Sequence, residues 1–405
     1  MADRDNWQGD VLRDLRGGAS QRTQGAQGAQ SPDGQASQPQ ASPAPASPAP
    51  ASPAPAPPAQ APPVPAAQAQ ALESPPQQAA PVVPTAPIPR PDRPTRPRPT
   101  PDSRPVVDPG LAAAVRKPRH GESLAARGVR AARRAVSSSV AREVADATRA
   151  AEILQQPVTT GRQIAVTSIR GGAGKSTVAA LLGTTYAHYR QDPVLVVEAD
   201  PALGSLPLRL GATSLRWTTG DVAQIVEPQM SLLDITGYLV QLPDNAWLLP
   251  GSQGQIGAML DTVTYERTMV ALRRYFGVAV VDCETLPAEV ARAALSAAQA
   301  RVLASPATLE GITSTYAVLQ WMRGLPRQVI AGTVVVLTEL VPHAGLDLGE
   351  AAQKLRSTGA SVQVLPYDRH LAAGGPIRTD LLAHPTREAV TRLAAEVFQL
   401  SQKRH

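Results

Sequence analysis

The sequence contains a single cysteine, Cys283, among 405 residues, and only 3% of its residues are aromatic. One cysteine excludes an intrachain disulfide framework and a four-cysteine metal site, and it is typical of a protein kept in a reducing compartment. No uninterrupted apolar run reaches the ~18 residues of a membrane-spanning helix. The first residues also lack the basic-then-apolar pattern of a signal peptide. We therefore expect a cytoplasmic protein without a transmembrane segment.

Proline, in contrast, is abundant and unevenly placed. Of the 41 prolines, 26 lie before residue 111, in a stretch dominated by Ala, Gln and Ser, and Ala-Ser-Pro-Ala-Pro occurs three times in tandem over residues 41–55. Such a composition cannot build a hydrophobic core, and the proline spacing favours extended polyproline II. We predict a disordered Pro/Ala/Gln-rich tail over residues 1–121.

The excess positive charge lies mainly in the N-terminal part of the chain. Residues 1–156 carry 18 Lys+Arg and 13 Asp+Glu, and 12 of these basic residues fall between Arg90 and Arg134. Such a segment is attracted to polyanions, meaning nucleic acid such as non-specific DNA, an anionic membrane or an acidic protein partner; the alternative is a solvated basic linker. Residues 122–156 are rich in Ala and Arg, with apolar residues near helical spacing, which predicts a linker helix that ends at Pro157.

Residues 157–405 alternate short β-branched runs with helical stretches. This is the pattern of buried parallel strands joined by helical crossovers. Strands are predicted over 163–169, 193–198, 246–249, 278–282, 301–304, 333–337 and 362–365, and helices over 176–189, 262–275, 287–299, 308–323, 347–358 and 385–400. The sequence therefore predicts one α/β domain with a doubly wound, mostly parallel sheet and helices on both faces.

The first of these strands leads directly into Arg170-Gly-Gly-Ala-Gly-Lys-Ser-Thr177, and an apolar helix follows at once. The glycines let main-chain N–H groups turn toward phosphate oxygens at the positive end of that helix. Lys175 would reach the β- and γ-phosphates, Ser176 would offer a hydroxyl to Mg²⁺, and Thr177 would contact the α-phosphate. The predicted nucleotide-binding residues are Gly171, Gly172, Ala173, Gly174, Lys175, Ser176 and Thr177.

The usual P-loop spacing would need glycine at position 169, where this chain has isoleucine. In this respect the loop resembles the deviant Walker A motif of the MinD/ParA ATPases, P-loop proteins of the SIMIBI class. The first lysine of that motif contacts the phosphates bound by the partner of an ATP-dependent homodimer. Arg170 stands at its position, so the resemblance implies a catalytic contact in trans made by arginine. The alternative is that Arg170 pairs with a carboxylate of its own chain.

The resemblance extends over about residues 162–400 and implies further site residues. Asp200 stands at the position that orients the attacking water, although it could instead cap a turn. Asp282, at the end of an apolar run, would hold Mg²⁺ together with Ser176. The neighbouring Cys283 is expected to serve packing. The six histidines show no metal-ligand spacing and are given no role.

The nucleobase is less well defined by the sequence. Val364-Leu-Pro-Tyr-Asp368 resembles a strand end that lies near the base in the family. Many relatives place an adenine-reading asparagine where this chain has Thr338-Glu339. The residues alone do not distinguish adenine from guanine. The expectation that the cofactor is ATP, with Mg²⁺, therefore comes from the resemblance and not from a base-reading residue.

Three functions follow from these patterns. The resemblance implies an ATPase, weak until a partner activates it, that switches between monomer and dimer to position or partition cargo such as a chromosome, a plasmid or a protein complex. A MinD-like domain behind a Pro/Ala-rich tail also resembles actinobacterial proteins associated with type VII secretion, which implies an accessory ATPase recruited through its tail. The third is a scaffold that binds nucleotide without hydrolysing it. The last helix is expected to pack on the sheet rather than to target a membrane.

Overall fold

The computed structural model describes residues 100–405 apart from 115–116, 137–139, 203, 343–344 and 404–405. The tail predicted over 1–121 therefore lies outside the described residues as far as residue 99. The described residues belong to one compact unit bounded by Pro99 and His405. None of the helices described in this unit is both long enough and apolar enough to cross a lipid bilayer.

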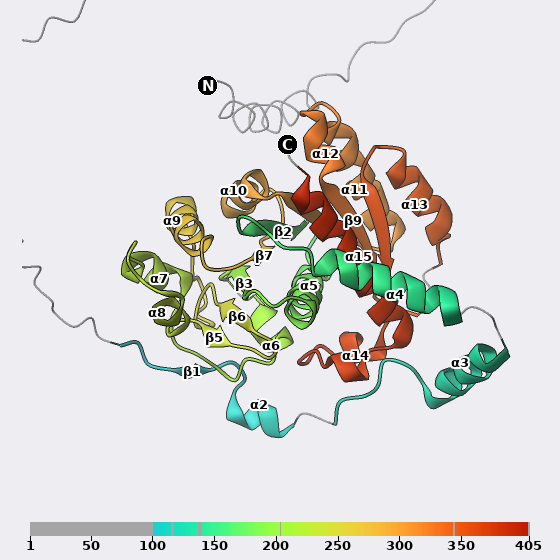
Figure 1. Ribbon diagram of the computed structural model, residues 1–405, viewed down its shortest axis with the longest axis horizontal. Helices are drawn as coiled ribbons and strands as arrows, with labels where there is room; N and C mark the ends of the chain where they lie inside the picture. The colour runs from blue at the N-terminus through green and yellow to red at the C-terminus, as the bar shows by residue number, and fades with distance from the viewer. Residues whose placement is uncertain (1–99, 115–116, 137–139, 203, 343–344, 404–405) are drawn as a thin grey trace, which may run out of the picture. The chain divides into compact units, whose positions relative to one another are not determined.

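An eight-stranded sheet forms the centre of the unit (Figure 1). The strand order is β10-β9-β8-β2-β7-β3-β6-β5, and every neighbouring pair is parallel except β5 with β6. The strands are β2 Arg162–Ser168, β3 Val194–Ala199, β5 Val240–Gln241, β6 Ala246–Leu249, β7 Val278–Cys283, β8 Ala300–Pro306, β9 Thr333–Thr338 and β10 Ser361–Leu365. The predicted fold class is confirmed, and all of the strands predicted from the sequence are present.

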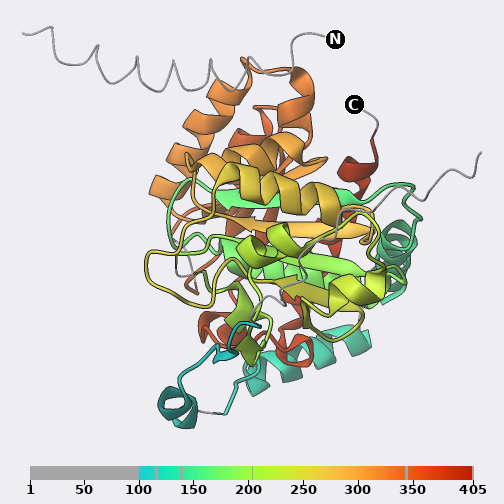
Figure 2. The same ribbon diagram turned by 90° about the vertical axis from the view of Figure 1, so that its left-hand side faces the viewer.

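Helices cover both faces of this sheet, and Figure 2 shows the strands between them. In β2, Ile164 and Val166 pack into one apolar cluster while Ala165, between them, packs into another, as the alternation of strand side chains requires. The first cluster includes α4 Val140–Leu154, α5 Lys175–Tyr189 and α15 His384–Gln402. On the other face lie α7 Thr219–Ile225, α9 Thr262–Leu272 and α10 Glu289–Ala297, and then α11 Leu309–Met322, α12 Arg327–Ala331 and α13 Leu348–Arg356.

The C-terminal helix α15 is part of the core. Its apolar side chains Val390, Leu393, Ala394, Val397 and Phe398 are all buried in the first cluster. The buried hydroxyl of Tyr186 donates to the carbonyl oxygen of Ala394 at 3.0 Å, and the guanidinium of Arg190 lies 4.5 Å from the centre of the Phe398 ring. This apolar face is therefore covered by the protein's own sheet and by α5.

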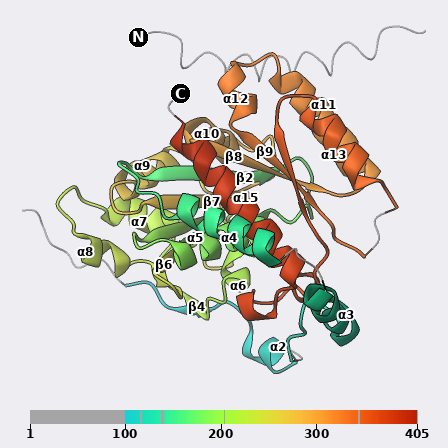
Figure 3. The ribbon, with the colours of Figure 1, turned by 45° about the vertical axis from the view of Figure 1, so that its right-hand side comes forward.

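Two helices stand where the sequence predicts one linker helix over 122–156: α3 Leu124–Val136 and α4. Helix α4 lies along α15 (Figure 3). Nε2 of His384, the first residue of α15, lies 2.6 Å from Oε1 of Glu143 in α4. The predicted linker thus contributes a packed helix to the compact unit.

Residues 102–114 and 117–121, which we call the N-terminal strap, contact the rest of the unit near both of their ends. Its strand β1 (Arg104–Pro105) pairs antiparallel with β4 (Ser214–Leu215). At its other end, Gly121 N donates to Leu381 O at 2.7 Å, and Gly121 O accepts from Arg369 N at 3.2 Å. The remaining short helices are α2 Pro109–Ala113, α6 Leu206–Arg209, α8 Leu232–Thr236, α14 Arg369–Ala372 and a 3-10 turn at Thr379–Leu381.

Candidate nucleotide-binding site

The loop between β2 and α5 holds two glycines in the left-handed region, with φ of 73° at Gly172 and 84° at Gly174. Other residues adopt this conformation at a cost, so the backbone itself accounts for glycine at both positions. Gly174 is the N-cap of α5 and supplies no side-chain cap, which leaves N–H groups of the first turn open to an anion. A Cβ added at Gly171 or Gly172 would meet no atom within 4 Å, so the loop is open on that side.

A cavity of about 380 Å³ lies against this loop, within the size range of small-molecule sites. Of the residues that the sequence predicts for the site, those that line the cavity are Gly172, Gly174, Lys175, Ser176 and Thr177. Arg170, Gly171, Ala173, Asp200 and Asp282 are outside its lining. The cavity therefore forms where the sequence places the phosphates, with the other predicted residues around it.

The opposite wall comes from the ends of β9 and β10. The Thr338 hydroxyl donates to Ala173 O at 2.9 Å and so ties β9 to the phosphate loop. Glu339 Oε2 accepts from Tyr367 N at 3.0 Å, which ties β9 to the segment that follows β10. Thr338, Glu339, Tyr367 and Asp368 all line the cavity. Both segments that the sequence associates with the base thus lie at the same cavity as the phosphate loop.

The sequence analysis did not anticipate Arg209, which also lines this cavity. Its Nη1 donates to Leu371 O at 2.9 Å, and its own carbonyl accepts from Ile377 N at 2.8 Å. Burial lowers the pKa of Arg209 below its usual value. No motif marks this residue in the sequence, because α6 has only four residues and reaches the cavity by folding against the segment around α14.

Lys175 and Asp200 form an ion pair, with Lys175 Nζ 3.0 Å from Asp200 Oδ2. Their side chains are 13% and 23% exposed. Lys175 opens α5, and Asp200 follows the end of β3, so the fold joins two predicted catalytic residues that are 25 positions apart. The alternative that Asp200 only caps a turn does not account for this contact with Lys175.

Two buried carboxylates lie side by side on neighbouring strands. Glu198 in β3 is the register partner of Asp282 in β7. Both oxygens of Asp282 and Oε1 of Glu198 find no hydrogen-bond partner of good geometry among the described residues, while Glu198 Oε2 accepts from Gly251 N at 3.1 Å. Burial is the main cause that raises the pKa of Glu198 to about 8 and that of Asp282 to about 7. The Lys175 charge and the Ser176 hydroxyl act in the opposite direction on Asp282.

These orphaned oxygens fit a hard divalent cation. Mg²⁺ takes carboxylate, hydroxyl and water oxygens, and a cation would compensate the charge that burial disfavours at Asp282. Asp282 and the nearby hydroxyl of Ser176 are therefore suited to hold Mg²⁺, as the sequence analysis expected. Glu198 was not named there as a site residue. The available signal was that adjacent parallel strands each end in a carboxylate next to the phosphate loop.

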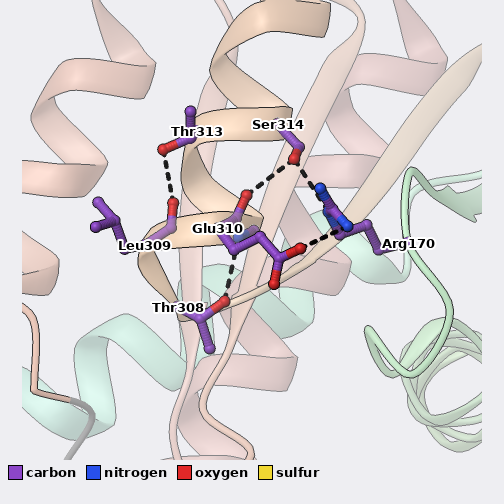
Figure 4. A network of polar contacts seen from close by, with 7 residues as sticks. Arg170, Thr308, Leu309, Glu310, Thr313 and Ser314 are labelled. Atoms are coloured by element: carbon purple, nitrogen blue, oxygen red, sulfur yellow. Dashed lines mark hydrogen bonds and ion pairs between the residues drawn. The ribbon is translucent and has the colours of Figure 1, made fainter.

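Arg170 contacts helix α11 of its own chain (Figure 4). Its Nη1 lies 2.6 Å from Glu310 Oε1, and its Nε donates to Ser314 Oγ at 3.0 Å. The Arg170 side chain is 46% exposed and that of Glu310 is 70% exposed. The structure thus shows the local ion pair that was the alternative to a contact in trans, and it identifies the carboxylate.

Cys283 lies next to Asp282 but faces the other side of β7, where it is fully buried in the second apolar cluster. Burial raises the pKa of its thiol above the usual range, which keeps the thiol protonated and unreactive. Its expected role in packing agrees with this position.

Residues 164–371 match the family described as the CobQ/CobB/MinD/ParA nucleotide binding domain. This match covers half of the sequence and includes the phosphate loop, both buried carboxylates and all of the described cavity-lining residues except Ala372. The chain belongs to this family of nucleotide-binding domains, whose MinD and ParA members are ATPases.

Individual proteins also resemble part of the chain. The ESX-1 secretion-associated protein EspI of Mycobacterium tuberculosis is 31% identical over 241 residues, which cover 58% of this chain and 36% of EspI. Among solved structures, a ParA family ATPase from Chlorobium tepidum is 14% identical with a TM-score of 0.48, and the match covers 57% of this chain and 98% of that one. MinD from Pyrococcus horikoshii, complexed with Mg-ADP, is 20% identical with a TM-score of 0.45, over 60% and 98%.

Proposed function

We propose that this chain binds ATP with Mg²⁺ in the cavity at the carboxyl ends of the strands and hydrolyses it, slowly until a partner activates it. The observation that supports this most strongly is an uncapped helix start close to buried carboxylate oxygens that have no partner among the described residues. The uncapped start of α5 at Gly174 favours a polyphosphate. The buried, unpartnered oxygens of Asp282 favour a divalent cation. A magnesium–triphosphate carries both charges in this arrangement.

Each part of the phosphate loop has a proposed task. Main-chain N–H groups of 171–177 bind phosphate oxygens, and Thr177 adds its hydroxyl. Ser176 and Asp282 hold Mg²⁺, which supplies charge neutralisation at the β- and γ-phosphates. Glu198 stays protonated in its buried position and leaves Asp282 as the charged ligand, because two adjacent buried carboxylates are unfavourable when both are ionised.

Lys175 and Asp200 are proposed to exchange partners when nucleotide binds. The lysine in this ion pair is the group that would contact the terminal phosphates. When Lys175 turns to a phosphate oxygen, Asp200 loses its partner and becomes free to orient a water molecule for attack on the γ-phosphate. Hydrolysis-competent geometry at Asp200 therefore depends on occupancy of the loop by a triphosphate.

We further propose that ATP promotes a homodimer in which Arg170 of each copy reaches the phosphates bound by the other. Arginine keeps the positive charge and offers several donors to phosphate oxygens. Dimer formation and hydrolysis would then make the protein a nucleotide-dependent switch. Its cargo would be a chromosome, a plasmid or a protein complex, which the basic residues between Arg90 and Arg134 would bind directly or through a protein partner.

A second candidate is an accessory ATPase of a type VII-like secretion system in the cytoplasm, recruited through the Pro-rich tail predicted over 1–121. The 31% identity to EspI favours this candidate, because that protein is described as ESX-1 secretion-associated. The two candidates share the nucleotide chemistry and differ in what the chain binds. A scaffold that binds ATP without turnover is the third outcome.

Calorimetric titration of the full chain with Mg-ATP tests nucleotide binding, and phosphate release tests turnover. If no nucleoside triphosphate gives a heat of binding, the proposal is wrong. ATP-dependent co-sedimentation with non-specific DNA, weakened steeply by salt, would support partitioning. Binding of residues 1–121 to a secretion component would support the second candidate. ATP binding without hydrolysis, even in the presence of DNA, lipid or a protein partner, would support the scaffold function.

A further inference from the structure

Arg170 is held by two side chains from the first two turns of one helix. Glu310 and Ser314 are four residues apart in α11, so they lie on the same face, and both turn toward the guanidinium group (Figure 4). They engage Nη1 and Nε, two of its three nitrogens. We call these two residues the Arg170 clamp.

The clamp residues are themselves fixed by the start of the helix. Thr308 is the N-cap of α11, and its hydroxyl oxygen accepts from Gly311 N at 3.1 Å, which sets the first turn that carries Glu310. The Ser314 hydroxyl donates to Glu310 O at 2.9 Å and leaves an oxygen lone pair for Arg170 Nε. On the other side, Ser168 Oγ donates to Arg170 O at 2.9 Å. Both sides of the contact are therefore preorganised.

The same contact is weak enough to open. The two charged side chains are 46% and 70% exposed, and ion pairs with this exposure change an equilibrium by a small factor, about threefold. Charge-assisted bonds from arginine to phosphate are stronger. The open space beside Gly171 and Gly172 leaves the loop accessible from the side on which Arg170 begins. Arg170 can thus be released by a phosphate without loss of any buried contact.

We propose that Glu310 and Ser314 are positioning residues that hold Arg170 on its own subunit until the phosphates bound by a second copy of this chain take it over. This inference rests on the proposed function, in which Arg170 acts in trans. The clamp competes with dimer formation and makes the dimer depend on a full triphosphate. Because each dimer opens two clamps, two factors of about three reduce the association constant by about tenfold.

The test uses the full chain, Mg²⁺ and the slowly hydrolysed analogue AMP-PNP, with sedimentation velocity over a range of protein concentrations. Glu310→Gln removes the clamp charge and keeps the side-chain shape. Glu350→Gln is the matched control, because it removes the same charge from an exposed residue in the first turn of α13. The double variant Arg170→Ala/Glu310→Gln asks whether the effect of Glu310 passes through Arg170.

We expect Glu310→Gln to tighten the AMP-PNP dimer about tenfold and to leave the affinity of the monomer for AMP-PNP and the melting temperature unchanged. With Mg-ADP it should gain nothing. The double variant should associate like Arg170→Ala alone. A merely structural role for Glu310 would change the melting temperature and not the nucleotide-specific association.

Other results overturn the clamp. If Glu310→Gln associates as the wild type does, or more weakly, Glu310 does not restrain Arg170. If Glu350→Gln shows the same gain, the cause is net charge. If the double variant associates more tightly than Arg170→Ala alone, the effect of Glu310 does not pass through Arg170. If the wild type binds AMP-PNP but neither the wild type nor any variant dimerises, the proposed role of Arg170 in trans is wrong, while the proposed nucleotide binding remains. If the wild type binds no AMP-PNP at all, the proposed function fails, and the clamp with it.

Discussion

Lys175 Nζ and Asp200 Oδ2 lie 3.0 Å apart, so the lysine of the phosphate loop and the carboxylate proposed to orient water are each other's partner. This contact joins phosphate binding to the chemical step, because one group cannot take up its proposed role without releasing the other. Substitution of either residue should therefore affect both binding and hydrolysis, in different directions.

Lys175→Ala should weaken Mg-ATP binding about a hundredfold or more, since it removes the only ammonium group among the described residues that line the cavity. Calorimetry of the full chain measures this. Lys354→Ala is a suitable control, because that lysine lies over the Tyr316 ring on α11, away from the cavity lining. An unchanged affinity in Lys175→Ala would mean that the nucleotide site is elsewhere.

Asp200→Ala should bind Mg-ATP as tightly as the wild type or several-fold more tightly, because Lys175 no longer has to leave an ion pair. Its turnover should fall at least about tenfold, since the proposed water-orienting group is gone. Single-turnover phosphate release, with ATP affinity measured in parallel, separates the two effects. Hydrolysis at the wild-type rate would exclude the role assigned to Asp200 and leave the binding site intact.

Glu198→Gln tests the buried carboxylate through the pH dependence of stability. Burial raises the pKa of Glu198 to about 8 from its usual 4.5, so the folded protein holds a proton that the unfolded chain has lost. The free energy of unfolding of the wild type is therefore highest below pH 4.5, where Glu198 is protonated in both states. It falls as the pH rises through 8, where the buried carboxyl has to ionise. Glutamine keeps an acceptor for Gly251 N and does not ionise. Without nucleotide or Mg²⁺, the variant should gain stability over the wild type from pH 5 to 8, on the order of 2 kcal/mol.

Thermal unfolding across that pH range provides the measurement for Glu198→Gln. Glu289→Gln, which removes an exposed carboxylate in the first turn of α10, serves as its control and should follow the wild type. Parallel pH profiles for Glu198→Gln and the wild type would mean that Glu198 is ionised in the folded protein throughout.

Gly121→Ala should loosen the N-terminal strap where it lies against Asp368. The added Cβ would overlap the Asp368 carboxylate and the main-chain nitrogen of Ala383. Overpacking of this kind costs about 1–3 kcal/mol. Because Asp368 lines the cavity and caps α14, ATP affinity should also fall several-fold. Gly128→Ala in α3, whose Cβ would meet nothing within 4 Å, should instead be neutral or slightly stabilising. Equal behaviour of the two variants in unfolding and binding would contradict this view of the strap.

The sequence predicted what local patterns encode. Buried parallel strands are continuous β-branched runs, and the phosphate loop has glycines at positions that need left-handed backbone, so both could be recognised without coordinates. Contacts between distant segments could not. Pairing of β1 with β4 joins two-residue strands more than a hundred positions apart, and neither has a periodic pattern of its own.

The same limit applies to the site. Glu310 and Arg209 carry no motif, and these two residues and Glu198 acquire their places only when α11, α6 and β3 are assembled around the loop. Asp282 and Lys175 could be proposed from the sequence because a buried run that ends in a carboxylate, and a lysine after three glycines, are unusual. Which carboxylate pairs with a charged surface residue, such as Glu310 with Arg170, depends on how the fold brings distant segments together.

The N-terminal strap contacts the rest of the unit through β1, which pairs with β4 after α6, and through Gly121, which lies against Asp368. A recombinant fragment trimmed to begin at residue 157 would leave β4 without its neighbour and expose the niche that Gly121 fills. Expression trials of the compact unit should start near residue 100. In the intact chain, a pulling force on the strap would be transmitted by the main-chain hydrogen bonds of Gly121 to the segment that holds Asp368, which lines the cavity.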